Sequence, residues 1–326
     1  MDRTILEFLK NHRTEYVSGQ SMSKHMGVSR TAVWKHINEL KKRGYQIESS
    51  SRKGYRLIAE PDLLTSDELS LGMPTRYLGQ NVICFETIGS TNNYIKDRAD
   101  QLPEGTLLVS EEQKAGRGRL GREWTSPSGK GIWMSLLLKP EISPQGAPKI
   151  TQIAAAALVE TVKELYGLDV KVKWPNDIVV NGRKVCGILT EMGSELGRVS
   201  HIVLGIGINA NIESFGGELA EKATSLKIEK GHAIDRKKFL FYFLKELESL
   251  LDRFFGEGDF EPALNICRRY SAVIGKRVWI NEKNSSVEVL ATGINNDGEL
   301  VVQYEDGSVK AIFSGEVSIR SENGYI

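Results

Sequence analysis

The sequence predicts an α+β multidomain protein in three parts. These are an N-terminal winged helix-turn-helix, a central α/β domain built on a mixed sheet, and a small C-terminal β-barrel of the SH3-like kind. Three observations support this fold class. Residues 1–60 combine helical spacing with positive charge, residues 62–270 alternate strand and helix patterns, and residues 271–326 hold short β runs separated by Asp-Gly turns.

The chain has 326 residues of ordinary globular composition, 40% of them hydrophobic. At about 150 residues per domain, this length favours two or three domains. The longest apolar run, 153–159, is too short for a membrane span, and no signal-peptide pattern follows Met1. Cys84, Cys186 and Cys267 are too scattered for a disulfide framework or a cysteine metal cage. We therefore expect a cytoplasmic protein with no membrane partner and no metal site.

The net charge of +1 conceals an asymmetry between the two ends of the chain. Residues 1–60 hold 12 Lys+Arg against 6 Asp+Glu, which gives +6, whereas the rest of the chain carries −5. A basic head on an acidic body favours a nucleic-acid partner for the head. A solvated charged surface would give the same imbalance, so charge alone does not decide.

The head is predicted to hold a helix-turn-helix at about 19–38. Gly27 suits the turn, Ser29 suits the N-cap of a third helix ending near Arg43, and Val33, Ile37 and Leu40 give that helix a buried face. A hairpin with a basic tip follows at 45–57. The exposed helix face and the tip supply the predicted DNA contacts: Ser29, Arg30, Thr31, Trp34, Lys35, Asn38, Arg52 and Lys53. The alternative is a small helical interaction domain with an incidental basic face.

The central segment, 62–270, predicts a mixed sheet with helices on one face. Strands are expected at 82–86, 106–110, 131–139, 170–173, 184–192 and 201–209, and helices at 92–99, 148–166 and 235–255. The third segment predicts strands at 277–280, 287–292, 300–304, 309–313 and 317–320.

A loop rich in arginine and glycine, 114–124, matches the pattern GxGxxG at Gly116, Gly118 and Gly121. A dinucleotide fingerprint needs a strand before it and a helix after it, and neither is expected here. Glycine lets backbone N–H groups approach an anion, and Arg117 and Arg119 add fork-shaped donors. The loop therefore predicts a mobile anion site, although a flexible or RNA-binding surface would look similar.

Three further stretches place polar groups at the ends of predicted elements. Pro175 ends a strand before Asn176 and Asp177, and a turn at 181–182 would return Lys184 close to Asp177. A simple turn with a cross-strand salt bridge is the alternative. The glycines of 205–209 clear space beside Asn209, and 89–92 forms a helix N-cap with exposed hydroxyls.

Taken in order, the motifs at 89–92, 116–119, 173–177, 182–188 and 205–209 resemble the bifunctional biotin–protein ligases and biotin-operon repressors of bacteria. The likeness covers essentially the whole chain, and Leu120 is a tolerable variation within the loop. Single-function ligases of this family lack the N-terminal head, so its presence here favours the bifunctional form.

The resemblance implies an ATP-dependent, AMP-forming ligase, with Mg²⁺ expected to accompany the ATP. Biotin is activated to biotinyl-5′-AMP and passed to a lysine of the biotin carboxyl carrier protein or domain of acetyl-CoA or pyruvate carboxylase. Lys184, Arg119 and Asp177 are the implied catalytic residues, Lys184 for adenylation and Asp177 to receive or orient the lysine amine. Biotin is assigned to Ser90, Thr91, Asn92, Gln113, Arg117, Gly118, Arg119 and Lys184, and ATP or the adenylate to Arg117, Arg119, Trp124, Asn176 and Asn209.

The same resemblance suggests a switch in which the adenylate orders the 114–130 loop, completes a homodimer surface and acts as corepressor at an operator. Three rival functions stay open. They are a repressor that binds the adenylate without transferring it, a lipoate–protein ligase, and a winged-helix protein with an interaction platform.

Overall fold

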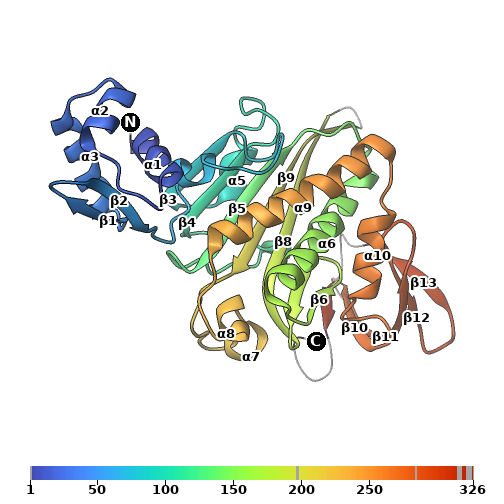
Figure 1. The fold of residues 1–326 in the computed structure, drawn as a ribbon. Helices are drawn as coiled ribbons and strands as arrows, with labels where there is room; N and C mark the ends of the chain where they lie inside the picture. Colours follow the sequence, from blue (N-terminus) through green and yellow to red (C-terminus); the bar gives the residue numbers. More distant parts are fainter. Residues whose placement is uncertain (1, 196–197, 283–284, 314–317, 321–324, 326) are drawn as a thin grey trace. The chain divides into compact units, whose positions relative to one another are not determined.

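The computed structural model describes residues 2–195, 198–282, 285–313, 318–320 and 325, and it divides into two compact units, Met1–Gly72 and Met73–Ile326 (Figure 1). Both the central sheet and the C-terminal strands belong to the second unit. The domain boundaries at 62 and 271 stay predictions. Over the described residues, no helix has the length and apolar character needed to cross a membrane.

The first unit is a winged helix-turn-helix, as predicted. Its elements are α1 (Asp2–Asn11), α2 (Gly19–Met26), α3 (Arg30–Lys42), β1 (Gln46–Ser50), β2 (Gly54–Ala59) and α4 (Ser66–Ser70). The Ser18 and Ser29 hydroxyls accept the backbone N–H groups of Ser21 and Ala32 at 3.0 and 3.1 Å, which starts α2 and α3. Gly27 ends α2 at φ +66°, a conformation that is cheap only for glycine.

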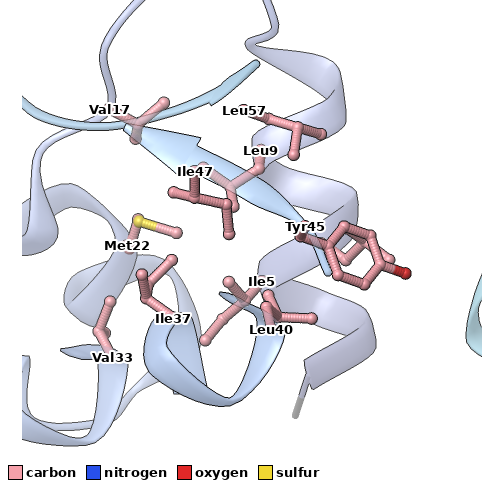
Figure 2. Close-up of a cluster of buried hydrophobic side chains, with 11 residues drawn as sticks. Ile5, Leu9, Val17, Met22, Val33, Ile37, Leu40, Tyr45, Ile47 and Leu57 are labelled. Atoms are coloured by element: carbon pink, nitrogen blue, oxygen red, sulfur yellow. The ribbon is translucent and has the colours of Figure 1, made fainter. Parts of the chain in front are cut away.

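The core of this unit decides which face of α3 is exposed. Figure 2 shows Val33, Ile37 and Leu40 of α3 packed with Met22, and with Ile5 and Leu9 of α1. The three α3 residues are fully buried, at the i, i+4 and i+7 spacing of one helix face. The opposite face of α3, with its cationic and aromatic side chains, is therefore left to solvent.

The second unit is built on a seven-stranded mixed sheet in the order β3-β4-β5-β9-β8-β7-β6. Only β3 and β4 run parallel, and every other neighbouring pair is antiparallel. The strands are β3 (Val82–Ile88), β4 (Leu107–Gln113), β5 (Gly131–Leu138), β6 (Val170–Lys173), β7 (Asp177–Val180), β8 (Arg183–Glu195) and β9 (Arg198–Asn209). The tight turn between β7 and β8 has positive φ at Asn181 and Gly182, as the Asn-Gly pair predicts.

Helices cover both faces of this sheet, so the prediction of helices on one face was wrong. Val203 packs against Ile95 of α5 (Thr91–Lys96). Leu204, the next residue after Val203, points to the opposite face of the sheet, and Thr190 of β8 pairs with it. On that face the Thr190 hydroxyl lies 2.7 Å from the Thr151 hydroxyl of α6 (Ala147–Tyr166). α9 (Arg236–Glu257) packs on α6 (Figure 1). Because α5 is short, it leaves room for a loop beside it on its own face of the sheet.

The second unit also contains several shorter helical elements. They are η1 (Arg119–Gly121), η2 (Pro144–Gly146), α7 (Leu219–Lys222), α8 (Leu226–Lys230) and α10 (Glu261–Arg269). α10 packs against α6, while the other four are short helical turns in the connections between strands and longer helices.

The C-terminal strands form one antiparallel sheet in the order β13-β12-β11-β10-β14. They are β10 (Arg277–Glu282), β11 (Ser285–Ile294), β12 (Leu300–Gln303), β13 (Val309–Ile312) and β14 (Ser318–Arg320). The Gly298 carbonyl accepts hydrogen bonds from Trp174 Nε1 (3.0 Å) and Gln152 Nε2 (2.6 Å). This sheet is thereby attached to the strand end that carries the Trp174-Pro175 motif. The segment that joins β13 to β14, 314–317, lies outside the described residues.

Candidate functional site

Two cavities in the second unit share a wall and bring the predicted site residues together. The narrow cavity, about 50 Å³, and the larger one, about 370 Å³, both contact Gly118, Arg119, Trp124, Asn176 and Lys184. Ser90, Thr91, Asn92, Gln113 and Arg117 line only the narrow one, and Asp177 and Asn209 only the larger. Every residue predicted to meet the two substrates therefore lies on this paired cavity.

The narrow cavity is floored by a network of short polar side chains. Gln113 Oε1 accepts the backbone N–H of Thr91 at 2.9 Å and its hydroxyl at 3.0 Å. The Ser135 hydroxyl lies 2.7 Å from Thr91 Oγ1 and 2.5 Å from Asn92 Oδ1. Ser90 caps α5. These uncharged donors and acceptors, all buried except the half-buried Gln113, suit an uncharged polar ring.

Glu191, which the sequence analysis did not single out, connects this network to the arginine loop. Its carboxylate accepts Asn92 Nδ2 at 3.0 Å and Arg117 Nη1 at 3.2 Å, and it lies 3.6 Å from Lys96. Arg117 also donates to Asn93 at 2.7 Å. The loop is therefore held over the narrow cavity by a charge-assisted contact with β8.

The 114–124 loop folds as a small hairpin rather than as a dinucleotide-binding turn. β4 runs to Gln113, so the expectation that no strand precedes the loop was wrong. The loop itself contains only the single 3-10 turn η1, and no α-helix follows it before β5. The backbone N–H of Trp124 donates to Gly116 O at 2.9 Å, and the backbone N–H of Gly118 donates to Arg122 O at 2.7 Å. The loop is therefore not a dinucleotide fingerprint, because the helix that such a fingerprint requires is missing.

Trp124 of this loop rests on two glycines of the sheet. A Cβ at Gly207 would lie 2.3 Å from Trp124 Nε1, and one at Gly187 would lie 2.9 Å from its ring. Lys184 Nζ is 5.0 Å from the ring centroid. Among the described residues the buried Nε1 has no hydrogen-bond partner. The 205–209 pattern predicts cleared space beside Asn209. In the structure the Trp124 ring fills the space at Gly207 and Gly187, and the Asn92 side chain fills that at Gly205.

Two predicted nucleotide ligands already make contacts within the protein. Asn176 accepts Arg119 Nη1 at 3.0 Å and donates to Ile188 O at 2.9 Å. Asn209 donates to Thr224 O at 3.0 Å. Asn176 therefore positions Arg119, and the Asn209 amide is fixed in the wall of the larger cavity.

Lys184 and Asp177 form an ion pair where the two cavities meet, with 2.6 Å between Nζ and Oδ1. Burial alone would raise the pKa of Asp177, but Lys184, a hydrogen bond from Tyr325 and nearby Lys173 outweigh it and hold that pKa below its ordinary value. Burial lowers the pKa of the Arg119 guanidinium. The site thus holds a carboxylate that is ionised at neutral pH, next to the Lys184 and Lys173 cations. Within the described part of the chain, no three His, Cys, Asp or Glu side chains gather as a metal site would require.

The first unit carries its own groove, between α2, α3 and the hairpin tip. Its lining includes Arg30, Thr31, Trp34, Arg52 and Lys53. Trp34 is 57% exposed, which is unusual for a side chain as large and apolar as that of tryptophan. Ser29 and Lys35 are also exposed, whereas Asn38 is half-buried.

Comparison with known proteins agrees with this arrangement. The Biotin/lipoate A/B protein ligase family matches residues 84–209, an HTH domain matches 2–56, and the Biotin protein ligase C terminal domain matches 273–320. The "Bifunctional ligase/repressor BirA" of Bacillus spizizenii is 40% identical over 320 residues, covering 97% of this chain and 98% of that protein. Its namesake from Escherichia coli is 32% identical over 307 residues, 94% of each chain.

Among solved structures, the biotin protein ligase from Aquifex aeolicus in complex with biotin and ATP is similar to this chain. It is 28% identical, with a TM-score of 0.66, and the match covers 74% of this chain and 100% of that one.

Proposed function

The chain belongs to the family of bifunctional biotin–protein ligases and repressors, and on that premise we propose how its residues divide the work. The protein activates biotin with ATP to biotinyl-5′-AMP and transfers biotin to a lysine of an acceptor protein. It also binds DNA as a repressor of biotin-synthesis genes. The similar proteins from Bacillus spizizenii and Escherichia coli support both activities.

We assign the narrow cavity to biotin and the larger one to the nucleotide. Thr91, Asn92 and Gln113 offer uncharged donors and acceptors that match the ureido group. Trp124 offers a flat face for adenine, and Asn209 an amide for its edge. Mg²⁺ would enter with the ATP phosphates, whose oxygens are the ligands it prefers.

Adenylation brings a carboxylate against a triphosphate, so two anions must approach each other. Lys184 and Arg119 supply positive charge at the junction of the two cavities, Arg117 adds charge in the narrow one, and Asn176 holds Arg119 in place. Preorganised cations of this kind stabilise the charge that develops on the α-phosphate. The position of Lys184, on both cavities and paired with Asp177, is the observation that carries the proposal.

Transfer requires the acceptor lysine to lose a proton and attack the biotinyl carbonyl carbon. The C–N bond forms, the C–O bond to the phosphate breaks, and AMP leaves with the electron pair, while the protons pass to solvent. Asp177 stays ionised at neutral pH because its pKa is lowered, which makes it a weak base. We therefore assign it to orienting the amine by charge.

The function is tested by the intact mass of a biotin carboxyl carrier domain after incubation with the protein, Mg-ATP and biotin. We expect the carrier to gain one biotin, and to stay unmodified when lipoate replaces biotin. An unmodified carrier with adenylate bound to the protein would instead identify a sensor. Modification by lipoate would move the assignment to a lipoate ligase.

Glu191→Gln is expected to loosen the arginine loop. The substitution keeps the shape of the side chain but removes the charge that holds Arg117, so biotinyl-5′-AMP should dissociate about 3–10-fold faster, as the loss of one charge-assisted hydrogen bond implies. The dissociation rate of the adenylate measures this. Glu195→Gln, farther along β8, is the control. Equal dissociation rates for the two variants would contradict a role of the Glu191–Arg117 contact in holding the loop.

For the repressor activity, we propose that the groove of the first unit contacts operator DNA through α3 and the hairpin tip. The cations there suit phosphates, and the polar face of α3 suits base edges in the major groove. We further propose that the adenylate, by ordering the loop, promotes a homodimer with two such heads. The acceptor is proposed to be a carboxylase carrier domain.

Arg52→Ala combined with Lys53→Ala is expected to weaken operator binding without changing its sequence preference. Each lost phosphate contact should reduce the slope of log K against log salt by about 1. Titrations at several salt concentrations measure the slope. Arg3→Ala, on α1 and outside the groove, is the control for the loss of a cation elsewhere on the first unit. An unchanged slope would exclude the tip from the DNA contact.

A further inference from the structure

Tyr325 binds the oxygen of the Asp177 carboxylate that Lys184 does not contact. The Tyr325 hydroxyl donates to Asp177 Oδ2, while Oδ1 is paired with Lys184 Nζ at 2.6 Å. Asp177 is only 9% exposed, so both of its oxygens are engaged in a nearly dry setting. An incoming ammonium would therefore have to compete with these two partners for the carboxylate.

Lys173 fixes the position of Tyr325, which we call its seat. Its Nζ donates to the Tyr325 carbonyl at 2.6 Å and lies 3.5 Å from the centroid of the tyrosine ring. Lys173 is 2% exposed, so its charge depends on such contacts. Two separate interactions, one to the backbone and one to the ring, therefore keep the hydroxyl aimed at Asp177.

Tyr325 lies in the larger cavity, which is assigned to the nucleotide and which also holds Asp177, the residue proposed to orient the incoming lysine. Tyr325 lines that cavity together with Trp124, Asp177 and Lys184. It also lies beyond the residues matched by the C-terminal domain of the family, 273–320, so the match to that domain says nothing about it.

We propose that Tyr325 is a positioning residue of the acceptor site, which it holds closed until transfer. During adenylation the tyrosine takes the place on Asp177 that the acceptor lysine needs, and it keeps water from that carboxylate. The lysine ammonium then displaces the hydroxyl from the same oxygen. The inference rests on the proposed function, since it requires Asp177 to receive the acceptor amine.

Two substitutions separate the hydroxyl from the rest of the side chain. Tyr325→Phe keeps the ring over Lys173 and the backbone carbonyl but removes the competitor for Asp177 Oδ2. We expect its KM for a biotin carboxyl carrier domain to fall about 3–10-fold, the effect of one net hydrogen bond, with kcat and the rate of pyrophosphate exchange unchanged. Tyr325→Ala also opens the seat, so adenylate bound to the protein should in addition be lost to water several-fold faster.

The experiment measures acceptor KM, kcat and pyrophosphate exchange on the full chain, with Tyr304→Phe as control. Tyr304 follows β12 and lies beside Lys310 outside the cavity. Wild-type protein is assayed first, because its failure to biotinylate would refute the proposed function rather than this inference. With an active wild type, a KM for Tyr325→Phe that is unchanged or raised, or a fall in kcat, would overturn the proposal. Either result would make the tyrosine a support for Asp177 rather than a competitor of the acceptor.

Discussion

Lys184→Ala is expected to slow adenylate formation by about two to three orders of magnitude, the cost of losing one preorganised electrostatic contact to a transition state. Lys184 lines both cavities and pairs with Asp177, so its removal takes charge from the place where we propose that the two anionic substrates meet. It also leaves the Asp177 carboxylate buried without its nearest cation. Pyrophosphate exchange dependent on biotin measures this step directly.

The exposed pair Lys171 and Asp169, 3.4 Å apart at the edge strand β6, provides matched controls for the buried pair. Lys171→Ala removes the same group from a solvated site, where an ion pair is worth little, and should exchange pyrophosphate at the wild-type rate. An exchange rate for Lys184→Ala within a few-fold of wild type would contradict the assignment of adenylation to Lys184.

Asp177→Asn is expected to separate the two half-reactions. The amide keeps the size of the carboxylate but cannot attract the acceptor ammonium, so transfer from preformed biotinyl-5′-AMP should slow about 100-fold. Adenylation should fall far less, because Lys184 keeps its charge and loses a competitor for the phosphate. A single-turnover assay that starts from the bound adenylate measures transfer alone.

The control for this variant is Asp169→Asn, which removes an exposed carboxylate and should transfer biotin normally. If Asp177→Asn slows both half-reactions to the same extent, the carboxylate serves to hold Lys184 in place. The acceptor amine would then have to be oriented by another group.

Local chemistry made much of the fold predictable. The N-cap at Ser29, the glycine turn at Gly27 and the turn at Asn181 act within a few residues, and the structure has them where the sequence predicts them. β4 extends through charged residues that were expected to form a loop, because β3 pairs with it as far as Gln113. Such an extension depends on a strand more than twenty residues away, which local pattern does not reveal.

The same distinction applies to the site. Residues within dense motifs, such as Lys184 and Trp124, were identified from the sequence and lie on the paired cavity. Ser135 and Glu191 were missed because neither belongs to a motif, and only the pairing of β5, β8 and β9 brings them to Asn92. Tyr325 had no motif around it at all.

We infer that a single site makes the molecule that controls the DNA-binding head. The most direct test is the affinity of the full chain for operator DNA with biotin and ATP together, with each alone, and with preformed biotinyl-5′-AMP. We predict tighter binding for wild type with both substrates or with the adenylate, and for Lys184→Ala only with a saturating concentration of preformed adenylate. Operator binding by the wild type that does not respond to biotin plus ATP would contradict the account, and so would a full response of Lys184→Ala to those substrates.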